Sequence, residues 1–398
     1  KKEVKKFPPP PFITSTLERA GASLFHWSAK KTMREAQQLY EKGLITYHRT
    51  DSVNLAQEAV KKARTYINNT FGKDYLPDKP RFYKSRSKLA QEAHEAIRPT
   101  KMEKDRNLKH RDAFKLYCLI FNRFIACQMN PQILEKDIVD IKAGKYMLRA
   151  IGQREKFAGW KKVYDKAEKE TFLPQLSENE KLQLIKVLSE QKFTQPPARY
   201  NEGSLIKALE ERGIGRPSTY ASIISTIQYR QYVEKIEGSF HPTAVGETVN
   251  DFLVKYFNNI VDYDFTAEME DDLDKIANGK RKWVAVVGEF YKPFAKKLEK
   301  VGKEAKRVKI PAEKIGKKCP QCKKGDQVIK IGKFGKFLSC SRFPDCKWKA
   351  AYIEKVKGFK CPDCGGDVLV RKTRKGKTFY GCSNWPKCKW ASWRKPKV

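Results

Sequence analysis

The chain has 398 residues and a formal net charge of +37, because 83 Lys and Arg face 46 Asp and Glu. This length exceeds one ordinary hydrophobic core, so we expect two to four domains. The positive surplus is typical of proteins that bind a polyanion, and nucleic acid is the default partner, although a structural RNA binder would carry the same charge as an enzyme. No run of about 18 apolar residues and no signal-like leader is present, which argues against a membrane protein or an exported one.

The spacing of the cysteines indicates whether they bind metal or form disulfides. Eight of the ten cysteines fall in close-spaced pairs within a lysine-rich chain, where reduced thiolates that hold a metal are more common than disulfides. This usage favours a reducing compartment, so we expect a cytoplasmic location. The first residue is Lys1 rather than Met, which predicts a fragment or a processed product.

The first third of the chain reads as a linker followed by a helical domain. Residues 1–11 are rich in lysine and contain four consecutive prolines, which predicts an extended linker. Apolar residues at helical spacing then predict a domain over 12–130, in which Gly43 caps one helix and a short strand, Leu44–Tyr47, follows. Its helices are predicted over residues 31–42, 55–68 and 111–128.

Two further domains are expected in the middle of the chain. Short β-type runs separated by glycine and charged turns predict a β-rich domain over 131–195. The order helix, turn, helix and hairpin over 196–300 is winged-helix-like. The elements expected there are helices over 204–212 and 218–230, a hairpin turn at Gly238-Ser239, an acidic helix over 265–276, and a basic amphipathic helix with its linker over 279–310.

The carboxyl end of the chain is a duplication. After a basic linker at 301–316, the pattern C-x2-C-x17-C-x5-C occurs twice, with corresponding cysteines 42 residues apart. Zinc takes four tetrahedral ligands, and two close-spaced thiolate pairs can supply them, so we expect structural Zn²⁺ in zinc ribbons at 317–352 and 358–395. Buried or disulfide-bonded cysteines are the alternative. The expected ligands are Cys319, Cys322, Cys340, Cys346, Cys361, Cys364, Cys382 and Cys388.

The duplicated region is also strongly basic. From Pro311 onward, 24 Lys and Arg accompany six Asp and Glu, and aromatic residues repeat together with the cysteines. Some of these aromatic side chains must form the small ribbon cores, and the others can stack on bases. A basic surface with interleaved aromatics is typical of proteins that bind single strands without sequence preference.

One tyrosine stands in a chemically suggestive setting. The stretch GLITYHRTDS, residues 43–52, places Tyr47 at the end of the predicted strand with Arg49 two residues later. Tyrosine can attack phosphorus, but its pKa near 10 demands help, and a cation assists both the phenolate and the phosphorus centre. Taken alone, a tyrosine beside an arginine is more often a core or surface residue than a nucleophile.

Four segments together resemble the type IA DNA topoisomerases. GLITYHRTDS is similar to the active-site motif of that family, and QEAHEAIRP at 91–99 is similar to its second motif. Residues 199–221, from RYNEGSLIKALE to GIGRPSTYA, resemble a third motif, and VDYDFTAEME at 261–270 resembles a fourth. With the cysteine tail, these segments span nearly the whole chain in the family's order.

The resemblance implies roles for five residues. Tyr47 would be the nucleophile that forms a 5′-phosphotyrosine with one DNA strand, Arg49 would steady the scissile phosphate, and His94 would assist cleavage. Arg216 and Thr219 match strand-contacting positions, and a guanidinium and a hydroxyl at a helix amino terminus suit phosphate by their own chemistry. From the residues alone, His94 reads as an ordinary helix histidine, and a capping turn explains Thr219 equally well.

The resemblance also implies a multidomain α+β fold that forms part of a toroid. Winged-helix-like domains at 12–130 and 196–300 would flank a β-rich hinge domain at 131–195, and two zinc ribbons would follow. The family's amino-terminal Toprim domain, whose acids bind most of the Mg²⁺, has no counterpart before Tyr47. We therefore expect the chain by itself to bind DNA but to cleave it poorly or not at all. The acids of residues 268–274 read as the solvated face of a helix rather than as a magnesium site.

Two alternatives stay open at this point. A non-catalytic fragment that binds single-stranded DNA would use the ribbons and the basic surface alone, and mutation of Tyr47 would leave it unchanged. The topoisomerase part of a reverse gyrase would carry a helicase domain upstream. A tyrosine recombinase is disfavoured, because its arginines and histidine are expected before the tyrosine.

The expected activity is relaxation of negatively supercoiled DNA by strand cleavage, strand passage and religation. It needs no ATP, and the chain contains no G-x-x-x-x-G-K-[ST] loop. We expect a monomer in the cytoplasm, associated with the nucleoid, whose partners are single-stranded and negatively supercoiled DNA. RNA polymerase and a separate chain that carries the Toprim domain are further candidate partners.

Overall fold

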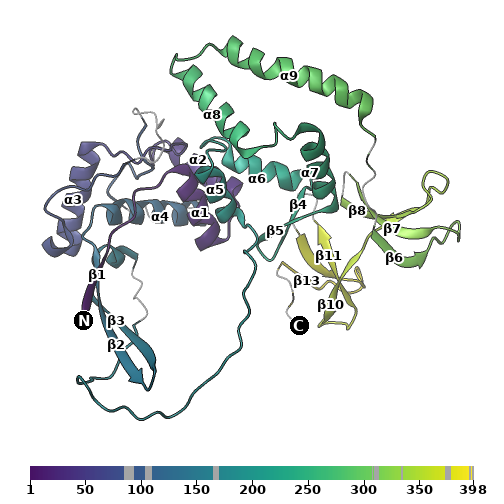
Figure 1. Ribbon diagram of the computed structural model, residues 1–398. Helices are drawn as coiled ribbons and strands as arrows, with labels where there is room; N and C mark the ends of the chain where they lie inside the picture. The colour runs from purple at the N-terminus through teal and green to yellow at the C-terminus, as the bar shows by residue number, and fades with distance from the viewer. Residues whose placement is uncertain are drawn as a thin grey trace. The chain divides into compact units, whose positions relative to one another are not determined.

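The computed structural model divides the chain into two units, Lys1–Ala305 and Lys306–Val398 (Figure 1). None of the helices in the described ranges is long and apolar enough to cross a membrane. The structure describes residues 1–84, 94–103, 110–164, 170–306, 308, 313–332, 335–372, 378–393 and 396.

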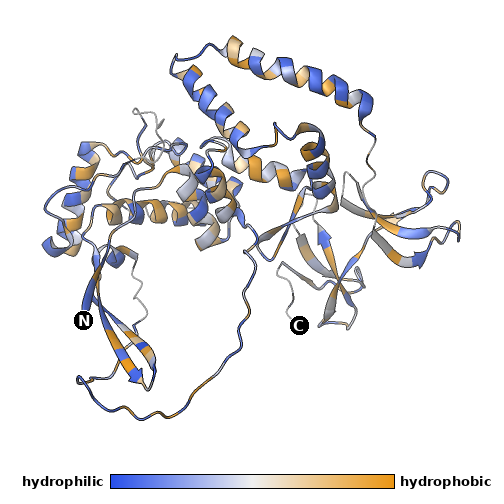
Figure 2. Ribbon diagram, in the orientation of Figure 1, coloured by the Kyte–Doolittle hydropathy of each residue, from blue (hydrophilic) through white to orange (hydrophobic). Residues whose placement is uncertain are grey.

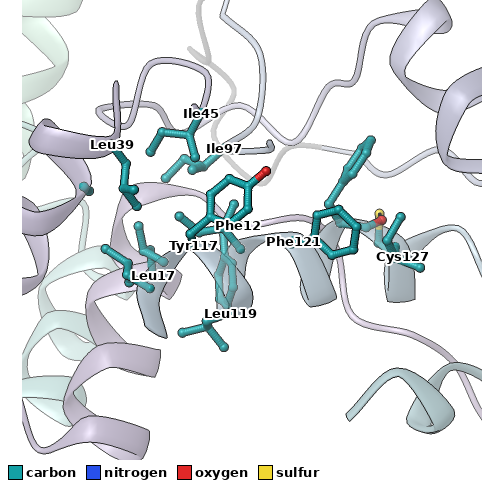
Figure 3. Close-up of a cluster of buried hydrophobic side chains, with 14 of the residues drawn as sticks. Phe12, Leu17, Leu39, Ile45, Ile97, Tyr117, Leu119, Phe121 and Cys127 are labelled. Atoms are coloured by element: carbon teal, nitrogen blue, oxygen red, sulfur yellow. Dashed lines mark hydrogen bonds between the residues drawn. The ribbon is translucent and has the colours of Figure 1, made fainter. Parts of the chain in front are cut away.

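The first part of unit 1 is built from four helices around a single core. These helices are α1 (Thr14–Phe25), α2 (Ala29–Glu41), α3 (Gln57–Phe71) and α4 (Arg111–Cys127). Helix α4 is mostly hydrophobic (Figure 2) and buries ten of its 17 residues. Figure 3 shows its Tyr117 and Phe121 in one cluster with Leu17 of α1 and Leu39 of α2. Each such side chain contributes about 1.5–3 kcal/mol by leaving water, so this cluster anchors the elements that carry the site.

Local signals explain where α2 begins and ends. The Ser28 side chain accepts a hydrogen bond from the Lys31 backbone N–H at 3.2 Å, so the helix starts two residues before the predicted Lys31. Gly43 follows the helix with a φ of +67°, a backbone conformation that glycine adopts without steric cost. The helices predicted over 55–68 and 111–128 are present as α3 and α4.

The predicted strand Leu44–Tyr47 is wrong, because this segment forms only an isolated bridge between Ile45 and Pro99. The ladder cannot extend on either side of that bridge. The Leu44 N–H instead donates to Leu39 O at the end of α2, at 2.9 Å. The Arg98 N–H donates at 3.0 Å to the Thr46 hydroxyl, and not to a backbone carbonyl.

The expectation that residues 1–11 are only a linker is also wrong. Residues Lys2–Lys6 form strand β1, which pairs antiparallel with β2 (Gln132–Ala143). Strand β2 forms a hairpin with β3 (Tyr146–Phe157), so the sheet order is β1-β2-β3. The β-type runs predicted in this part of the chain are therefore present, whereas residues 174–200 contain neither a helix nor a strand.

The second part of unit 1 follows the predicted order of helix, turn, helix and hairpin. Helices α5 and α6 lie close to the predicted limits, the hairpin turns just before Ser239, and three longer helices follow. Figure 2 shows polar and apolar residues alternating along the last of them. The elements are α5 (Glu202–Glu211), α6 (Tyr220–Tyr229), β4 (Val233–Ile236), β5 (Ser239–Pro242), α7 (Ala244–Phe257), α8 (Tyr263–Ala277) and α9 (Trp283–Glu304).

Helix α5 also contacts the first part of the chain. Ser15 of α1 donates to the Glu210 carboxylate at 2.6 Å, and the Glu202 carboxylate accepts the backbone N–H of Ala29, the first residue of α2, at 2.7 Å. A carboxylate at a helix amino terminus is stabilised by the free N–H groups there. These contacts tie the element that precedes the Gly-Arg-Pro turn to the two helices that hold the Tyr47 loop.

Unit 2 consists of two four-stranded antiparallel sheets with the same topology. Five of the eight ligand cysteines are buried, together with Val368 in the second sheet, so each small core is organised around thiols. The first sheet contains β6 (Glu313–Lys318), β7 (Asp326–Gly332), β8 (Gly335–Cys340) and β9 (Lys349–Ala351). The second contains β10 (Glu354–Lys360), β11 (Asp367–Lys372), β12 (Thr378–Cys382) and β13 (Ala391–Ser392).

Candidate functional site

Alternation along the loop after α2 presents Tyr47 to solvent. Tyr47 is 45% exposed and Arg49 is also exposed, whereas His48 and Thr50 between and after them are buried. Thr14, the first residue of α1, holds the backbone of this loop through its hydroxyl. The Thr14 hydroxyl donates to His48 O at 2.8 Å and accepts the Thr50 N–H at 2.9 Å. The phenol and the guanidinium therefore point outward from a backbone that is held at both ends.

The Tyr47 ring packs against two other aromatic rings. The ring centroids of Tyr40 and His48 lie 5.2 and 5.4 Å from that of Tyr47, in edge-on arrangements. Neither His48 nitrogen has a hydrogen-bond partner among the described residues. Burial, assisted by the positive charge of Arg49, lowers the His48 pKa to about 4. The imidazole beside Tyr47 is therefore neutral near pH 7 and serves as a packing surface.

His94 lies on a segment that is paired with the Tyr47 loop. Residues Gln91–Ala93 of its motif lie outside the described part of the chain, and His94 itself is half-buried. The Glu95 carboxylate accepts the Ala56 N–H at 2.7 Å and forms a two-pronged ion pair with Arg98, at 2.6 and 2.9 Å. The sequence predicted an ordinary helix as the alternative setting of His94, whereas the structure places His94 outside any helix.

In the Gly-Arg-Pro turn before α6, the Arg216 guanidinium is already hydrogen-bonded to other residues of the chain. The Arg216 guanidinium donates to Asp274 Oδ2 of α8 at 2.8 and 3.2 Å, and to the carbonyls of Gly213 and Gly215 at 3.1 and 2.9 Å. Asp271 lies 3.6 Å away on the same helix. Burial disfavours the charge, but Asp274 outweighs it and raises the Arg216 pKa. The N–H groups expected to contact DNA are therefore engaged within the chain.

Thr219 closes the same turn. Its hydroxyl accepts the Arg216 N–H at 2.8 Å and is also within hydrogen-bond distance of Arg216 O, at 3.1 Å. The hydroxyl therefore stabilises the turn itself, and it does not cap the N–H groups of α6 as the alternative from the residues alone would have it. A DNA contact by Thr219 would have to use the same hydroxyl.

The acids of α8 do not form a simple solvated face. Asp274 pairs with Arg216, and Asp272 pairs with Lys275 at 2.9 Å and with Arg281 at 2.6 Å. Glu270 accepts the Gly215 N–H at 3.2 Å. Among the described residues, only cysteines form groups with the geometry of a metal site. The acids present here therefore do not fit a Mg²⁺ site.

The eight tail cysteines fit two zinc sites. The sulfur atoms of each set lie within 4.8 Å of one another. The closest pairs are 3.6 Å apart in the first set and 3.3 Å apart in the second, where a zinc tetrahedron with bonds of about 2.3 Å needs sulfurs about 3.8 Å apart. The backbone N–H of Gly325 lowers the pKa of Cys322, and that of Gly366 lowers the pKa of Cys364, whereas burial raises the pKa of Cys340. With four sulfur ligands each, the sites would be structural.

Several residues that hold the site were not predicted. They include Thr14, Thr46, Glu95 and Arg98, whose partners lie up to 52 positions away in the chain. Thr46 was visible inside the GLITYHRTDS stretch, but only its neighbour Tyr47 suggested chemistry. The acid partner of Arg216 lies 58 residues further on and carried no local signal.

Comparisons with known proteins identify the family of the chain. The profile of the family described as DNA topoisomerase matches residues 1–288, and that of the family described as topoisomerase DNA binding C4 zinc finger matches residues 316–351 and 358–397. DNA topoisomerase 1 of Rickettsia bellii is 45% identical over 387 residues, which cover 89% of this chain and 48% of that protein. DNA topoisomerase 1 of Campylobacter jejuni is 43% identical over 359 residues, which cover 87% of this chain and 51% of that protein.

A solved structure is similar over most of the chain as well. Full-length topoisomerase I from Thermotoga maritima superposes with a TM-score of 0.67 at 35% sequence identity, covering 88% of this chain and 58% of that one. The chain thus spans about half the length of the curated relatives that it matches.

Proposed function

Because the chain belongs to the type IA family of DNA topoisomerases, we propose that it supplies the nucleophile for reversible cleavage of one DNA strand. Tyr47 attacks a backbone phosphorus, the bond from phosphorus to the 3′-oxygen breaks, and the strand is held as a 5′-phosphotyrosine. The freed 3′-hydroxyl later attacks the same phosphorus and releases Tyr47. The phosphotyrosine conserves the energy of the broken bond, so relaxation of negatively supercoiled DNA needs no ATP.

The observation that carries this proposal is the outward pair of Tyr47 and Arg49 on a clasped loop. The phenol is 45% exposed, although His48 after it is buried and Thr46 before it is half-buried. The exposed guanidinium two residues on is free to bind the phosphate that Tyr47 attacks, where it stabilises the developing charge. His94 then assists cleavage from the segment that pairs with the Tyr47 loop.

DNA binding is the second part of the proposal. Arg216 and Thr219 contact the strand that leads to Tyr47, and the zinc ribbons bind single-stranded DNA through basic and aromatic side chains. Exposed Trp385 and Trp393 support base stacking, and so does Phe343, over whose ring Lys330 and Lys349 lie. Part of a toroid, with winged-helix-like domains, is the architecture that we propose for unit 1.

The proposed reaction needs Mg²⁺ from elsewhere. The described acids do not form a suitable cluster, so we assign Mg²⁺ to the Toprim domain that the family resemblance implies, supplied by another segment or another chain. Its role when bound is to neutralise charge at the cleaved phosphate. We expect this chain alone to bind DNA and to cleave it poorly.

The decisive experiment is a trapping assay. The purified chain is mixed with Mg²⁺ and a 3′-labelled single-stranded oligonucleotide, with and without a separately expressed Toprim domain. We expect a denaturant-resistant adduct in the complete mixture, and none with Tyr47→Phe. Tyr40→Phe is the matched control, because it removes the neighbouring phenol and should leave the adduct in place.

The competing function is that of a non-catalytic DNA-binding fragment. It is favoured by the Arg216 guanidinium, which is already hydrogen-bonded to Asp274 within the chain. Tight binding of the oligonucleotide without an adduct in either mixture would establish it in place of the cleavage reaction.

A further inference from the structure

The side chain of Thr46 links the Tyr47 segment to the His94 segment. Thr46 precedes Tyr47, and its hydroxyl donates to Ala96 O at 2.7 Å and accepts the Arg98 N–H at 3.0 Å. The Thr46 backbone N–H also donates to Arg98 O at 2.9 Å. The residue therefore spans both ends of the short segment that follows His94.

These bonds have an unusual consequence for the backbone. In an antiparallel pair centred on Ile45 and Pro99, the Arg98 N–H would normally donate to the Thr46 carbonyl. The Thr46 hydroxyl accepts that hydrogen bond instead, so the Arg98 N–H has a partner although the strand does not continue. The chain is free to turn away after Thr46, and the next side chain, Tyr47, emerges into solvent.

On both sides of the Thr46 hydroxyl, the two segments are held by buried side chains and further hydrogen bonds. Ile45 and Ile97 are buried at 2% and 0% exposure and belong to the same hydrophobic cluster (Figure 3). The Ile97 N–H donates to Phe12 O at 2.8 Å, and Glu95 is fixed by Ala56 and Arg98. The Thr46 hydroxyl thus adds side-chain hydrogen bonds to the backbone bonds between two segments whose apolar side chains are already buried.

We propose that Thr46 is a positioning residue, whose hydroxyl sets the Tyr47 phenol and the His94 imidazole in register for one phosphate. This inference rests on the proposed function, and it adds a residue that touches neither DNA nor metal. Loss of the hydroxyl leaves the Arg98 N–H without an acceptor and lets the two segments shift. Small displacements of reacting groups cost large factors in rate.

The test compares three variants in the whole chain. Thr46→Val keeps the shape but loses both side-chain bonds, and Thr46→Ser keeps the hydroxyl. Thr100→Val is the matched control, because the Thr100 hydroxyl belongs to the same pairing and donates to Gly43 O at 2.7 Å, away from Tyr47. We expect Thr46→Val to slow adduct formation by about tenfold or more, and the other two variants to stay within about twofold.

A second measurement does not depend on cleavage. The chain has five histidines, so the His94 ring signals can be assigned in an NMR spectrum by comparison with His94→Gln. We expect Thr46→Val to shift or broaden the His94 signals, whereas Thr46→Ser and Thr100→Val leave them in place. Melting temperatures of all variants identify any loss that follows stability alone.

The outcomes separate the two proposals. Wild-type rates for Thr46→Val, or an equal loss in Thr100→Val at a matched melting temperature, would overturn the positioning role while the cleavage reaction stands. If the wild-type chain forms no adduct in the complete mixture with Mg²⁺ and the Toprim domain, the proposed function fails, and the His94 signals decide alone. Unchanged signals in Thr46→Val would then show that the hydroxyl does not set the His94 segment.

Discussion

The Tyr47 loop and the Arg216 turn are both proposed to meet DNA, yet they stand in opposite states. The backbone of the Tyr47 loop is hydrogen-bonded to Thr14, while the Tyr47 phenol and the Arg49 guanidinium are exposed. The Arg216 turn holds its guanidinium against Asp274 and two backbone carbonyls. The exposed guanidinium of the first loop can bind a phosphate directly, whereas that of the second must first give up its internal partners.

This difference separates catalysis from binding in the proposed reaction. Arg49 contributes charge at the reacting phosphate without giving up a hydrogen bond or ion pair to any of the described residues. Arg216 gains a phosphate only by losing an ion pair, so its net contribution to affinity is reduced by the strength of that pair. Changes at the two arginines should therefore differ in kind as well as in size.

The largest effect is expected on the pH dependence of stability, from a buried carboxyl in α1, the helix that contacts both the Tyr47 loop and α5. Glu18 of α1 is fully buried, neither of its oxygens has a hydrogen-bond partner in the described part of the chain, and burial together with nearby Glu202 raises its pKa to about 8. A carboxyl whose folded pKa is raised stabilises the fold below its unfolded pKa, near 4.5, and that stability is lost as the pH rises to 8. Stability should fall by roughly 3 kcal/mol between pH 5 and pH 8 on this account.

Glu18→Gln tests that expectation, because it removes the titrating group and keeps the shape. Urea unfolding of both chains between pH 5 and pH 8 should show a falling stability for the wild type and a much flatter profile for the variant. Parallel profiles for the two chains would mean that another group causes the pH dependence.

Arg49→Ala is expected to have the next largest effect. Removing a donor that stabilises charge in a transition state costs about 100-fold in rate, so adduct formation should fall by that factor in the complete mixture. Affinity for a single-stranded oligonucleotide, measured by fluorescence anisotropy, should change little. Arg49→Lys keeps the charge but not the planar fork, and it should recover part of the rate. An equal loss of affinity and rate would make Arg49 a binding residue instead.

The sequence predicted the parts of this arrangement that depend on local spacing. The helices followed from apolar periodicity, and the two cysteine sets followed from a pattern repeated 42 residues apart. Strand β1 was missed because its lysine-rich residues pair with β2, more than 120 positions later. The strand at Leu44–Tyr47 was predicted from its residue types, but the end of α2 and the Thr46 hydroxyl took the N–H groups that would have extended it.

The state of Arg216 could not be predicted for a similar reason. Its type and its place before a helix indicated a phosphate contact, and both features are present. Its ion pair depends on how α8 packs against the turn, and the acids of α8 read as solvent-exposed when taken by themselves. Long-range pairing of this kind decides whether a predicted binding residue is available.

Asp274→Asn is expected to have the smallest effect of these changes, on the affinity of the Arg216 turn for DNA. The pair is partly exposed, at 26% for Arg216 and 29% for Asp274, and such pairs contribute up to about 1 kcal/mol, which corresponds to roughly fivefold in Kd. Releasing Arg216 should tighten binding of a single-stranded oligonucleotide by up to that factor. One added phosphate contact should also steepen the salt dependence of log K by about 0.7.

Asp272→Asn is the matched control for this change. Asp272 lies on the same helix and carries the same charge, but it pairs with Lys275 and Arg281 and not with Arg216. If both variants tighten binding equally, the gain comes from net charge alone. If Asp274→Asn weakens binding, the ion pair holds the turn in its DNA-binding shape, and Arg216 acts as a structural brace in a loop that binds through Thr219 and the backbone.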